Sequence, residues 1–257
     1  MSAAAPADAA AATDTCLRGK VAIVTGGAGG LGTAVTSCLR AAGAEVLPVD
    51  LAGEGCYVAD VATPEGNEAM VAEALARHGR LDVLVLNAGV QHRASIETFP
   101  VDEWHRLLDV MVTGPFLAIR AAWPHLVREP GGRVVAVAST SGLAAEPLKA
   151  GYVTAKHALV GLLKVAALEG AQLGLTANSV APTWMGTPLI ERQVQEQMRL
   201  HGESRDAVIE RLTEGQPVKR FLDLMEVAET IRFLATPAAS GINGSCIPVD
   251  LGALAQA

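Results

Sequence analysis

Short apolar stretches alternate along the chain with stretches in which apolar residues recur at helical spacing. The stretches of strand length cover residues 20–25, 44–49, 56–59, 81–86, 133–138, 175–180 and 247–249, and the helical ones cover residues 33–42, 64–78, 101–127, 152–173 and 188–212. Continuous apolar strands separated by helices are typical of a parallel sheet that is covered on both faces. The sequence therefore predicts an α/β fold with a single doubly wound parallel sheet and helices on both faces.

One connection between two strands is too short to contain a helix. Only residues 51–55 separate the second strand, which closes with Asp50, from the apolar piece at residues 56–59. A crossover between parallel strands normally takes a dozen or more residues. We therefore expect the second crossover helix to be missing and the third strand to be short.

Length and composition indicate one folded domain. The chain has 257 residues, of which 50% are hydrophobic and 18% charged. Domains of roughly 200 to 250 residues are routine for α/β folds, and this much apolar material excludes a disordered chain. Residues 16–257 are expected to form a single domain in which residues 183–220 act as a lid over a cleft. The alanine-rich residues 1–15 lack the features of a secretion signal and are expected to be a disordered tail.

Charge and cysteine content narrow the class of partner. Twenty basic against 27 acidic residues give a net charge of -7, with no dense basic block, so neither nucleic acid nor an anionic membrane surface is expected as a partner. No apolar run approaches the roughly 20 residues that cross a bilayer. The four cysteines are scattered without metal-ligand spacing, which predicts reduced thiols in a cytoplasmic protein and no metal site. A small molecule is the expected partner.

A glycine-rich run lies between the first strand and the first helix. Its sequence, Thr-Gly-Gly-Ala-Gly-Gly-Leu-Gly, covers residues 25–32 and includes Gly26, Gly30, Leu31 and Gly32. Backbone N–H groups and the positive end of a helix at this place can bind the phosphates of a dinucleotide. The run satisfies several glycine spacings at once and does not choose among dinucleotide-binding families. By itself it also fits a flexible turn.

Asp50 stands at the end of the second strand, 18 residues after Gly32. A carboxylate at this place can accept hydrogen bonds from both hydroxyl groups of an adenosine ribose, and it would repel a 2′-phosphate. Residues 50–60 contain no arginine or lysine to offset that repulsion. The sequence therefore favours NAD over NADP, although an aspartate that merely ends a strand remains an alternative.

Tyr152 and Lys156 lie four residues apart at the start of a predicted helix, so both side chains lie on one helix face. A phenol has a pKa near 10, and a nearby ammonium group favours its ionised form, which would make Tyr152 an acid/base group. Ser139 follows the fifth strand and would reach the same cleft, where its hydroxyl could hold a carbonyl oxygen. A Tyr/Lys pair at this spacing is otherwise common on exposed helices.

Taken together, these residues resemble the short-chain dehydrogenase/reductase family, whose fold is of the Rossmann type. The matching motifs, in family order, are residues 25–32, Asp60 with Val61, Asn87-Ala88-Gly89, Ser139, Tyr152-x-x-x-Lys156, and Pro182 with Thr187. The resemblance implies that Tyr152 exchanges a proton with the substrate and that Lys156 lowers the pKa of Tyr152 and binds the nicotinamide ribose. It also implies that Ser139 polarises the substrate carbonyl. A hydride would pass between the cofactor and a substrate carbon.

The resemblance also implies a set of cofactor contacts. Asp60 and Val61 would bracket the adenine, Asn87 to Gly89 would line the cofactor channel, and Thr187 would contact the carboxamide. The full predicted cofactor-binding set is Gly26, Gly30, Leu31, Gly32, Asp50, Asp60, Val61, Asn87, Ala88, Gly89, Tyr152, Lys156, Pro182 and Thr187.

One departure from the family pattern concerns proton transfer. Met111 takes the place of the asparagine that usually completes a four-residue proton relay in this family. A thioether is a weak acceptor and does not reproduce the hydrogen bonds of an amide. Either water or another group, such as Thr113, substitutes for the asparagine, or turnover is slow.

Within the family, the chain is most similar to the 3-hydroxybutyrate dehydrogenases. In those enzymes two glutamines and a lysine hold the substrate carboxylate, and their positions are taken here by Gln91, Lys149 and Gln193. Trp184 would wall the substrate cavity. Where those enzymes place a histidine, this chain has Ser141, which leaves more room, and His92 could partly replace it. A small hydroxy acid and its keto acid are the predicted substrates.

Two other functions remain open on the sequence. Ser141 and Met111 also suit a reductase or dehydrogenase of an uncharged secondary-metabolite ketone or alcohol, and loss of turnover through Met111 would leave an NAD-binding sensor. Plain structural roles also remain for three residues: Lys149 as a solvated charge, Gln193 as an exposed helix residue and His92 as a loop residue. Members of the resembled family are usually homotetramers or dimers, so a homo-oligomer is expected.

Overall fold

Seven parallel strands form one sheet in the computed structural model, which describes residues 15–256. The strands are β1 (Val21–Thr25), β2 (Glu45–Asp50), β3 (Tyr57–Val58), β4 (Val83–Leu86), β5 (Arg133–Val137), β6 (Thr176–Pro182) and β7 (Cys246–Val249), and their order in the sheet is β3-β2-β1-β4-β5-β6-β7. Each pair of neighbouring strands is parallel. The first three strands are added toward one edge of the sheet. After β3 the chain crosses back to the other side of β1, where β4 lies, and the later strands are added toward the opposite edge. The predicted doubly wound sheet is confirmed.

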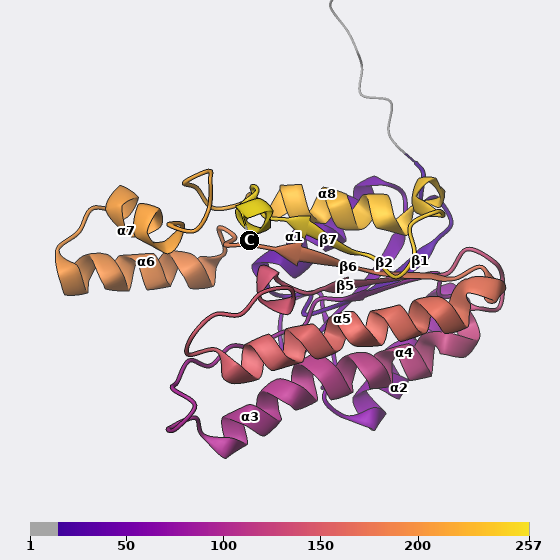
Figure 1. The fold of residues 1–257 in the computed structure, drawn as a ribbon. Coiled ribbons are helices and arrows are strands. Elements are labelled where there is room, and N and C mark those ends of the chain that lie inside the picture. Colours follow the sequence, from indigo (N-terminus) through magenta and orange to yellow (C-terminus); the bar gives the residue numbers. More distant parts are fainter. Residues whose placement is uncertain (1–14, 257) are drawn as a thin grey trace, which may run out of the picture.

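Helices cover both faces of this sheet (Figure 1). The helices are α1 (Gly30–Ala41), α2 (Pro64–His78), α3 (Val101–Leu108), α4 (Gly114–Leu126), α5 (Ala150–Gly170), α6 (Pro188–His201), α7 (Arg205–Leu212) and α8 (Leu224–Ala235). One core cluster joins α1 and α8 to the sheet, and a second joins α2, α4 and α5 to its other face. Because both faces are buried, β1, β4 and β5 are apolar at nearly every position and carry no alternation.

The short connection between β2 and β3 contains no helix, as predicted. Residues 51–56 cross directly from one strand to the next. Gly53 and Gly55 both adopt positive φ angles, 137° and 76°, a region that other residues rarely enter. Two glycines therefore allow a compact turn in place of a crossover helix.

Two predicted helical stretches are interrupted. The stretch at residues 101–127 contains a π-helical turn, Asp109–Thr113, between α3 and α4. Directly after this turn Gly114 passes so close to another segment that a Cβ would lie 2.6 Å from the carbonyl oxygen of Val61. The stretch at residues 188–212 is divided into α6 and α7, because the left-handed Gly202 ends α6 in the manner of a helix C-cap.

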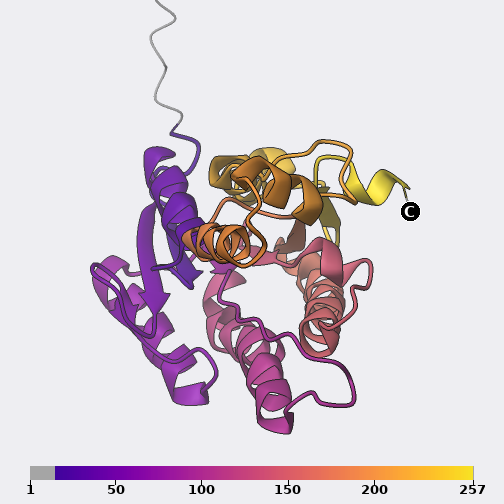
Figure 2. The same cartoon turned by 90° about the vertical axis from the view of Figure 1, so that its left-hand side faces the viewer.

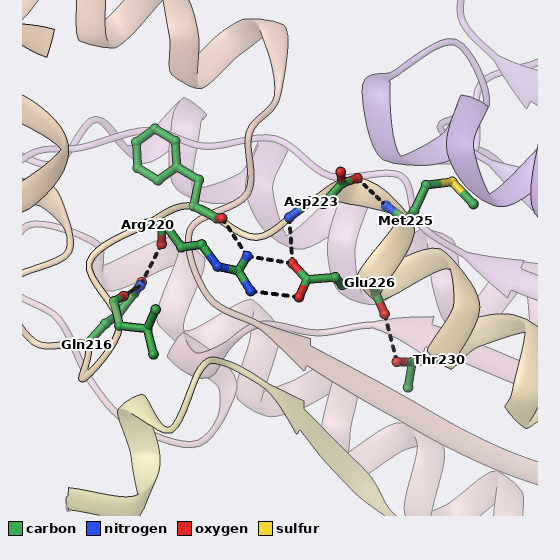
Figure 3. A network of polar contacts seen from close by, with 8 residues as sticks. Gln216, Arg220, Asp223, Met225, Glu226 and Thr230 are labelled. Carbon is green, nitrogen blue, oxygen red and sulfur yellow. Dashed lines mark hydrogen bonds and ion pairs between the residues drawn. The ribbon is translucent and has the colours of Figure 1, made fainter. Parts of the chain in front are cut away.

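The helical spacing in the sequence predicts no helix where α8 lies, at Leu224–Ala235. The helix begins with a capping box, in which the Asp223 side chain accepts from backbone N–H groups and the Glu226 side chain accepts from the Asp223 N–H. Arg220, at the end of the preceding loop, forms two hydrogen bonds with Glu226, of 2.7 and 2.9 Å, and Gln216 donates to the Arg220 carbonyl oxygen (Figure 3). This network ties the segment that follows α7 to the body of the fold.

The helices α6 and α7 project beyond the carboxyl end of the sheet and lie in front in the view of Figure 2. Ile190, Val194 and Val208 join the two helices through a small core of their own, against which Trp184 packs. Among residues 15–256, no helix is both long and apolar enough to span a bilayer. The predicted tail falls, apart from Thr15, outside the described residues.

Candidate active site

A cavity of about 260 Å³ opens at the carboxyl end of the sheet. This is where an open α/β sheet places its ligands. Twelve of the residues predicted for the site line it: Leu31, Asn87, Gly89, Gln91, Ser139, Ser141, Lys149, Tyr152, Lys156, Pro182, Trp184 and Thr187. Residues from α1, β5, β6, α5, α6 and the loops that follow β4 and β5 therefore meet at one place.

Ser139, Tyr152 and Lys156 reach the cavity from two neighbouring elements. Ser139 follows β5 and caps a short 3₁₀ turn, where its hydroxyl accepts a hydrogen bond from the Ser141 N–H at 3.1 Å. Tyr152 and Lys156 lie in the first two turns of α5, and the Lys156 Nζ is 5.6 Å from the centre of the Tyr152 ring. Side chains four residues apart share one helix face, so α5 presents both to the cavity that Ser139 also lines.

Burial sets the pKa of both groups on α5. The Lys156 Nζ donates to the Val137 carbonyl oxygen at 2.7 Å, and its desolvation lowers the pKa of Lys156 to about 8. The pKa of Tyr152 is raised, first by desolvation and further by the negative charge of Glu146, while a hydrogen bond with Ser139 opposes the rise. We expected Lys156 to make this phenol more acidic. Lys156 is not among the groups that shift this pKa, and the desolvation of the ring outweighs the hydrogen bond with Ser139.

The glycine-rich loop, residues 25–32, is held in place by close contacts with the neighbouring backbone; it is called the cradle below. Gly26 has a φ angle of 66°, and a Cβ there would lie 2.9 Å from the Ala88 Cα, while a Cβ at Gly32 would collide with the Gly26 carbonyl. The Asn87 side-chain amide donates to the carbonyl oxygens of Thr25 and Gly26 at 2.9 and 3.0 Å. Only glycine permits so close an approach of the backbone. This bare loop at the N-terminus of α1 fits the pyrophosphate of a dinucleotide.

Asp50 lies beside this loop at the end of β2. Its carboxylate accepts hydrogen bonds from the N–H groups of Ala28 and Leu51, at 3.0 and 2.8 Å. An ionised carboxylate has about four lone-pair sites, so capacity remains for ribose hydroxyl groups. The geometry fits the predicted role of Asp50 toward an adenosine ribose.

Seven predicted cofactor residues lie outside the lining of the main cavity: Gly26, Gly30, Gly32, Asp50, Asp60, Val61 and Ala88. Val61 and Ala88 line a smaller hollow beside α4. Asp60 is exposed and accepts from the Ala62 N–H at 2.9 Å. These residues continue the cradle from the cavity along the carboxyl ends of β1 to β4, in the direction in which a dinucleotide extends.

Met111 lies in the π-helical turn and is fully buried. Its sulfur is 3.6 Å from the position that a Cβ on Gly89 would take, and its cluster includes Ala155 and the Tyr152 side chain. Thr113, which we considered as a substitute for the missing asparagine, is exposed. The structure therefore places an apolar contact where the family's amide would stand, and Thr113 does not replace it.

The substrate end of the cavity contains a residue that the sequence reasoning missed. Glu146 lines the cavity and accepts hydrogen bonds from the Ser141 hydroxyl and the Lys149 Nζ, each at 2.7 Å. The Lys149 Nζ also lies 5.0 Å from the centre of the Trp184 ring. These donors hold the pKa of Glu146 below its usual range, against the opposing effect of burial. The spacing of three residues between Glu146 and Lys149 was the available signal.

Two further residues considered for substrate binding, Gln193 and His92, are not among the described residues that line the cavity. The side chain of Gln193 lies outside the described part of the chain, although its backbone belongs to α6. His92 does not line the cavity: its ring packs edge-on against Phe99 with a centroid distance of 5.4 Å, and its Nδ1 is 3.6 Å from Glu103. His92 therefore does not replace the histidine for which Ser141 stands.

Comparison with known proteins defines the family. The family model described as "Enoyl-(Acyl carrier protein) reductase" matches residues 26–253. D-beta-hydroxybutyrate dehydrogenase of Rhizobium meliloti is 37% identical over 256 residues, which cover 92% of this chain and 99% of that one. The chain belongs to the short-chain dehydrogenase/reductase family and is an oxidoreductase that acts on hydroxyl groups, and its fold implies a nicotinamide cofactor.

Solved structures agree with this assignment. Aldohexose dehydrogenase of Thermoplasma acidophilum superposes with a TM-score of 0.89 at 31% identity, and the match covers 95% of this chain and 97% of that one. An NAD⁺-bound xylitol dehydrogenase superposes with a TM-score of 0.83 at 28% identity, covering 91% and 98% of the two chains. The sheet, the cradle and the cavity therefore belong to a fold that serves dehydrogenation of several kinds of hydroxyl compound.

Proposed function

We propose that this protein is an NAD-dependent oxidoreductase that interconverts a small hydroxy acid, similar to 3-hydroxybutyrate, and its keto acid. The observation that carries the proposal is the meeting of Ser139, Tyr152 and Lys156 with the buried ammonium group of Lys149 in one cavity. The first three residues supply proton transfer at an oxygen atom. Lys149 supplies a charge that a carboxylate can bind.

The proposed mechanism assigns one task to each side chain. In oxidation, the Tyr152 phenolate accepts the proton of the substrate hydroxyl, and in reduction the phenol returns it. Ser139 donates a hydrogen bond to the same substrate oxygen and stabilises the charge that develops there. Lys156 is held by the Val137 carbonyl oxygen and binds the nicotinamide ribose. A nicotinamide cofactor, when bound, supplies hydride transfer at the substrate carbon.

NAD rather than NADP is the proposed cofactor. The carboxylate of Asp50 faces the cradle through its bond to the Ala28 N–H, and a 2′-phosphate at this place would meet a negative charge. The xylitol dehydrogenase to which the chain is similar was solved with NAD⁺ bound. Both observations support the choice made from the sequence.

The remaining cavity residues are proposed to hold the substrate. Gln91 and Lys149 would bind the carboxylate with Gln193 of α6, Trp184 would limit the size of the substrate, and Ser141 would leave room beside it. The segment at residues 183–220, with α6 and α7, would act as the lid. The relative from Rhizobium meliloti is named for oxidation of a hydroxy acid of this class, which supports the proposal.

A second candidate, an uncharged secondary-metabolite ketone or alcohol, has one specific observation in its favour. Lys149 is already paired with Glu146 at 2.7 Å. A substrate without charge would leave this pair undisturbed.

A substrate panel distinguishes the two candidates. Purified protein is mixed with NAD or NADP and with short hydroxy acids, including both enantiomers of 3-hydroxybutyrate, and with uncharged secondary alcohols, and reduced cofactor is followed by fluorescence. We expect signal with NAD and at least one hydroxy acid, and a much weaker signal with NADP. Turnover confined to uncharged alcohols would refute the hydroxy-acid proposal, and a preference for NADP would refute the role of Asp50.

We also propose that the protein is a homotetramer or dimer that works in the cytoplasm. The helix α5 is apolar over much of its circumference, and Val165 and Leu168 are exposed on it, as is Phe116 on α4. A helix that is apolar all round is normally buried, and a second copy of the chain would cover this face. Cysteines without paired spacing suit a reducing compartment.

A further inference from the structure

Glu146 places a negative charge at the end of the cavity that would hold the substrate carboxylate. Its side chain is 40% exposed, whereas that of Lys149 is 6% exposed. The two Glu146 oxygens receive one hydrogen bond each, from Ser141 and Lys149, and each keeps a further lone pair for a ligand. The cavity therefore offers an acceptor beside the donor.

A simple carboxylate fits this pair poorly. Lys149 has three N–H donors, of which one is directed to Glu146, while its ammonium group also faces the Trp184 ring. A substrate carboxylate that binds a remaining N–H comes within a few ångströms of the Glu146 carboxylate. Like charges at that distance repel each other. Binding of 3-hydroxybutyrate through Lys149 alone is opposed by Glu146.

A ligand that carries both an acceptor and a donor satisfies both residues. The Lys149 Nζ and the Glu146 Oε2 are 2.7 Å apart, so the matching groups on the ligand must stand on neighbouring atoms. A carboxylate with a hydroxyl or ammonium group on the adjacent carbon has this arrangement. An ammonium group also balances the charges, because its positive charge meets Glu146 and the carboxylate meets Lys149.

We propose that the substrate is a 3-hydroxy acid with a hydrogen-bond donor, an ammonium or hydroxyl group, on its second carbon, and that Glu146 selects for this donor. The proposal rests on the proposed function and names its substrate class more closely. The oxidation moves a hydride from the third carbon to NAD⁺ and the hydroxyl proton to Tyr152, and it yields the 2-substituted 3-oxo acid and NADH. Lys149 binds the carboxylate, and Glu146 accepts from the donor.

The test compares three acids in matched variants. Steady-state NADH formation is measured at saturating NAD with 3-hydroxybutyrate, 2,3-dihydroxybutyrate and 2-amino-3-hydroxybutyrate. Every stereoisomer of each acid is tested separately. The enzymes are the unmodified protein, Glu146→Ala, Glu146→Gln and the control Glu73→Gln. Glu73 forms an ion pair with Arg77 on α2 at 2.6 Å and lies outside the cavity lining, so its loss removes a paired carboxylate elsewhere.

The unmodified protein and the control are expected to prefer at least one acid with a donor over 3-hydroxybutyrate by about tenfold or more in kcat/KM, since bonds to charged groups are the stronger ones. Glu146→Ala removes this preference and lowers the KM for 3-hydroxybutyrate, with a smaller change in kcat. Should this variant fail to fold, as judged by its melting temperature, Glu146→Gln must still lose the preference for the amino acid.

Three results would overturn the proposal. The first is equal or better use of 3-hydroxybutyrate by the unmodified protein, and the second is a preference for the donor-bearing acids that survives in both Glu146 variants. The third is turnover of uncharged alcohols with none of the three acids oxidised, which would also refute the proposed function. The first two results leave the proposed function intact, so the two failures can be told apart.

Discussion

At the scale of single residues, burial and two neighbouring residues set the pKa of Tyr152. Burial raises its pKa, the charge of Glu146 raises it further, and the hydrogen bond with Ser139 lowers it. In the proposed oxidation, the Tyr152 phenolate is the base that accepts the hydroxyl proton. Among the described neighbours, Ser139 therefore favours the ionised form; its single O–H can donate to Tyr152 or to the substrate oxygen, but not to both at once.

Replacement of Ser139 tests this balance. In Ser139→Ala the pKa of Tyr152 rises, because the hydrogen bond that stabilised the phenolate is lost, so the rise of the oxidation rate with pH moves to higher pH. At pH values below this rise, the oxidation rate should fall on the order of 100-fold, as when one oxyanion donor is removed. The pH profiles of kcat and kcat/KM provide the measurement.

Thr230→Ala serves as the control for this experiment, because it removes a hydroxyl that only donates to the Glu226 carbonyl oxygen on α8. Its pH profile should match that of the unmodified protein. An unshifted profile in Ser139→Ala would contradict the role given to Ser139.

Residue types and spacings predicted much of the candidate site, but not its electrostatics. The Tyr152 and Lys156 pair could be placed because four residues on a helix define one face. Glu146 could not be placed in the same way, because its contacts depend on the path of the loop between β5 and α5. That loop contains Leu148 with a φ angle of 66°, a strained conformation that apolar spacing does not reveal.

At the scale of elements, the strands and most helices follow from local signals. The helix α2 begins with Thr63, whose side chain accepts from the Gly66 N–H, and ends before the left-handed Gly79. The π-helical turn between α3 and α4 could not be predicted, because it adds no break to the apolar pattern. Directly after the turn, Gly114 lies close to Val61, a contact between distant segments that the apolar pattern does not reveal.

The helix α8 differs from the π-helical turn, because the residues that mark its start are close together in the sequence. Asp223 and Glu226 have the spacing of a capping box, and the structure confirms both hydrogen bonds of that motif. The pairing of Arg220 with Glu226 adds a fixed end to the segment that carries α6 and α7 (Figure 3). In the proposed lid, this pairing would hold the end of the segment that leads into α8.

At the scale of the whole molecule, the apolar outer faces of α4 and α5 bear on assembly. Leu168 is 79% exposed in the single chain. A dimer would bury this side chain, whereas its exposure in a monomer favours aggregation. Size-exclusion chromatography with light scattering should give the mass of two or four chains. Leu168→Glu together with Val165→Glu should reduce a dimer to one chain and a tetramer to two chains or one, because charges are depleted from interface cores.

A monomeric unmodified protein at micromolar concentration would contradict the assembly proposal. An unchanged mass in the double variant would show that these two residues lie outside the interface. As a control, Glu73→Gln leaves the two helices untouched and should keep the mass of the unmodified protein.

The proposed function depends on the phenolic oxygen of Tyr152, and removal of this oxygen tests the proposal most directly. In Tyr152→Phe, NADH formation from the preferred hydroxy acid should fall by about a thousandfold or more, while NADH binding, followed by fluorescence titration, stays within about twofold. The chain has one other tyrosine, Tyr57, which lies outside the cavity lining. Tyr57→Phe should therefore keep full activity. Turnover in Tyr152→Phe close to that of the unmodified protein would contradict the account.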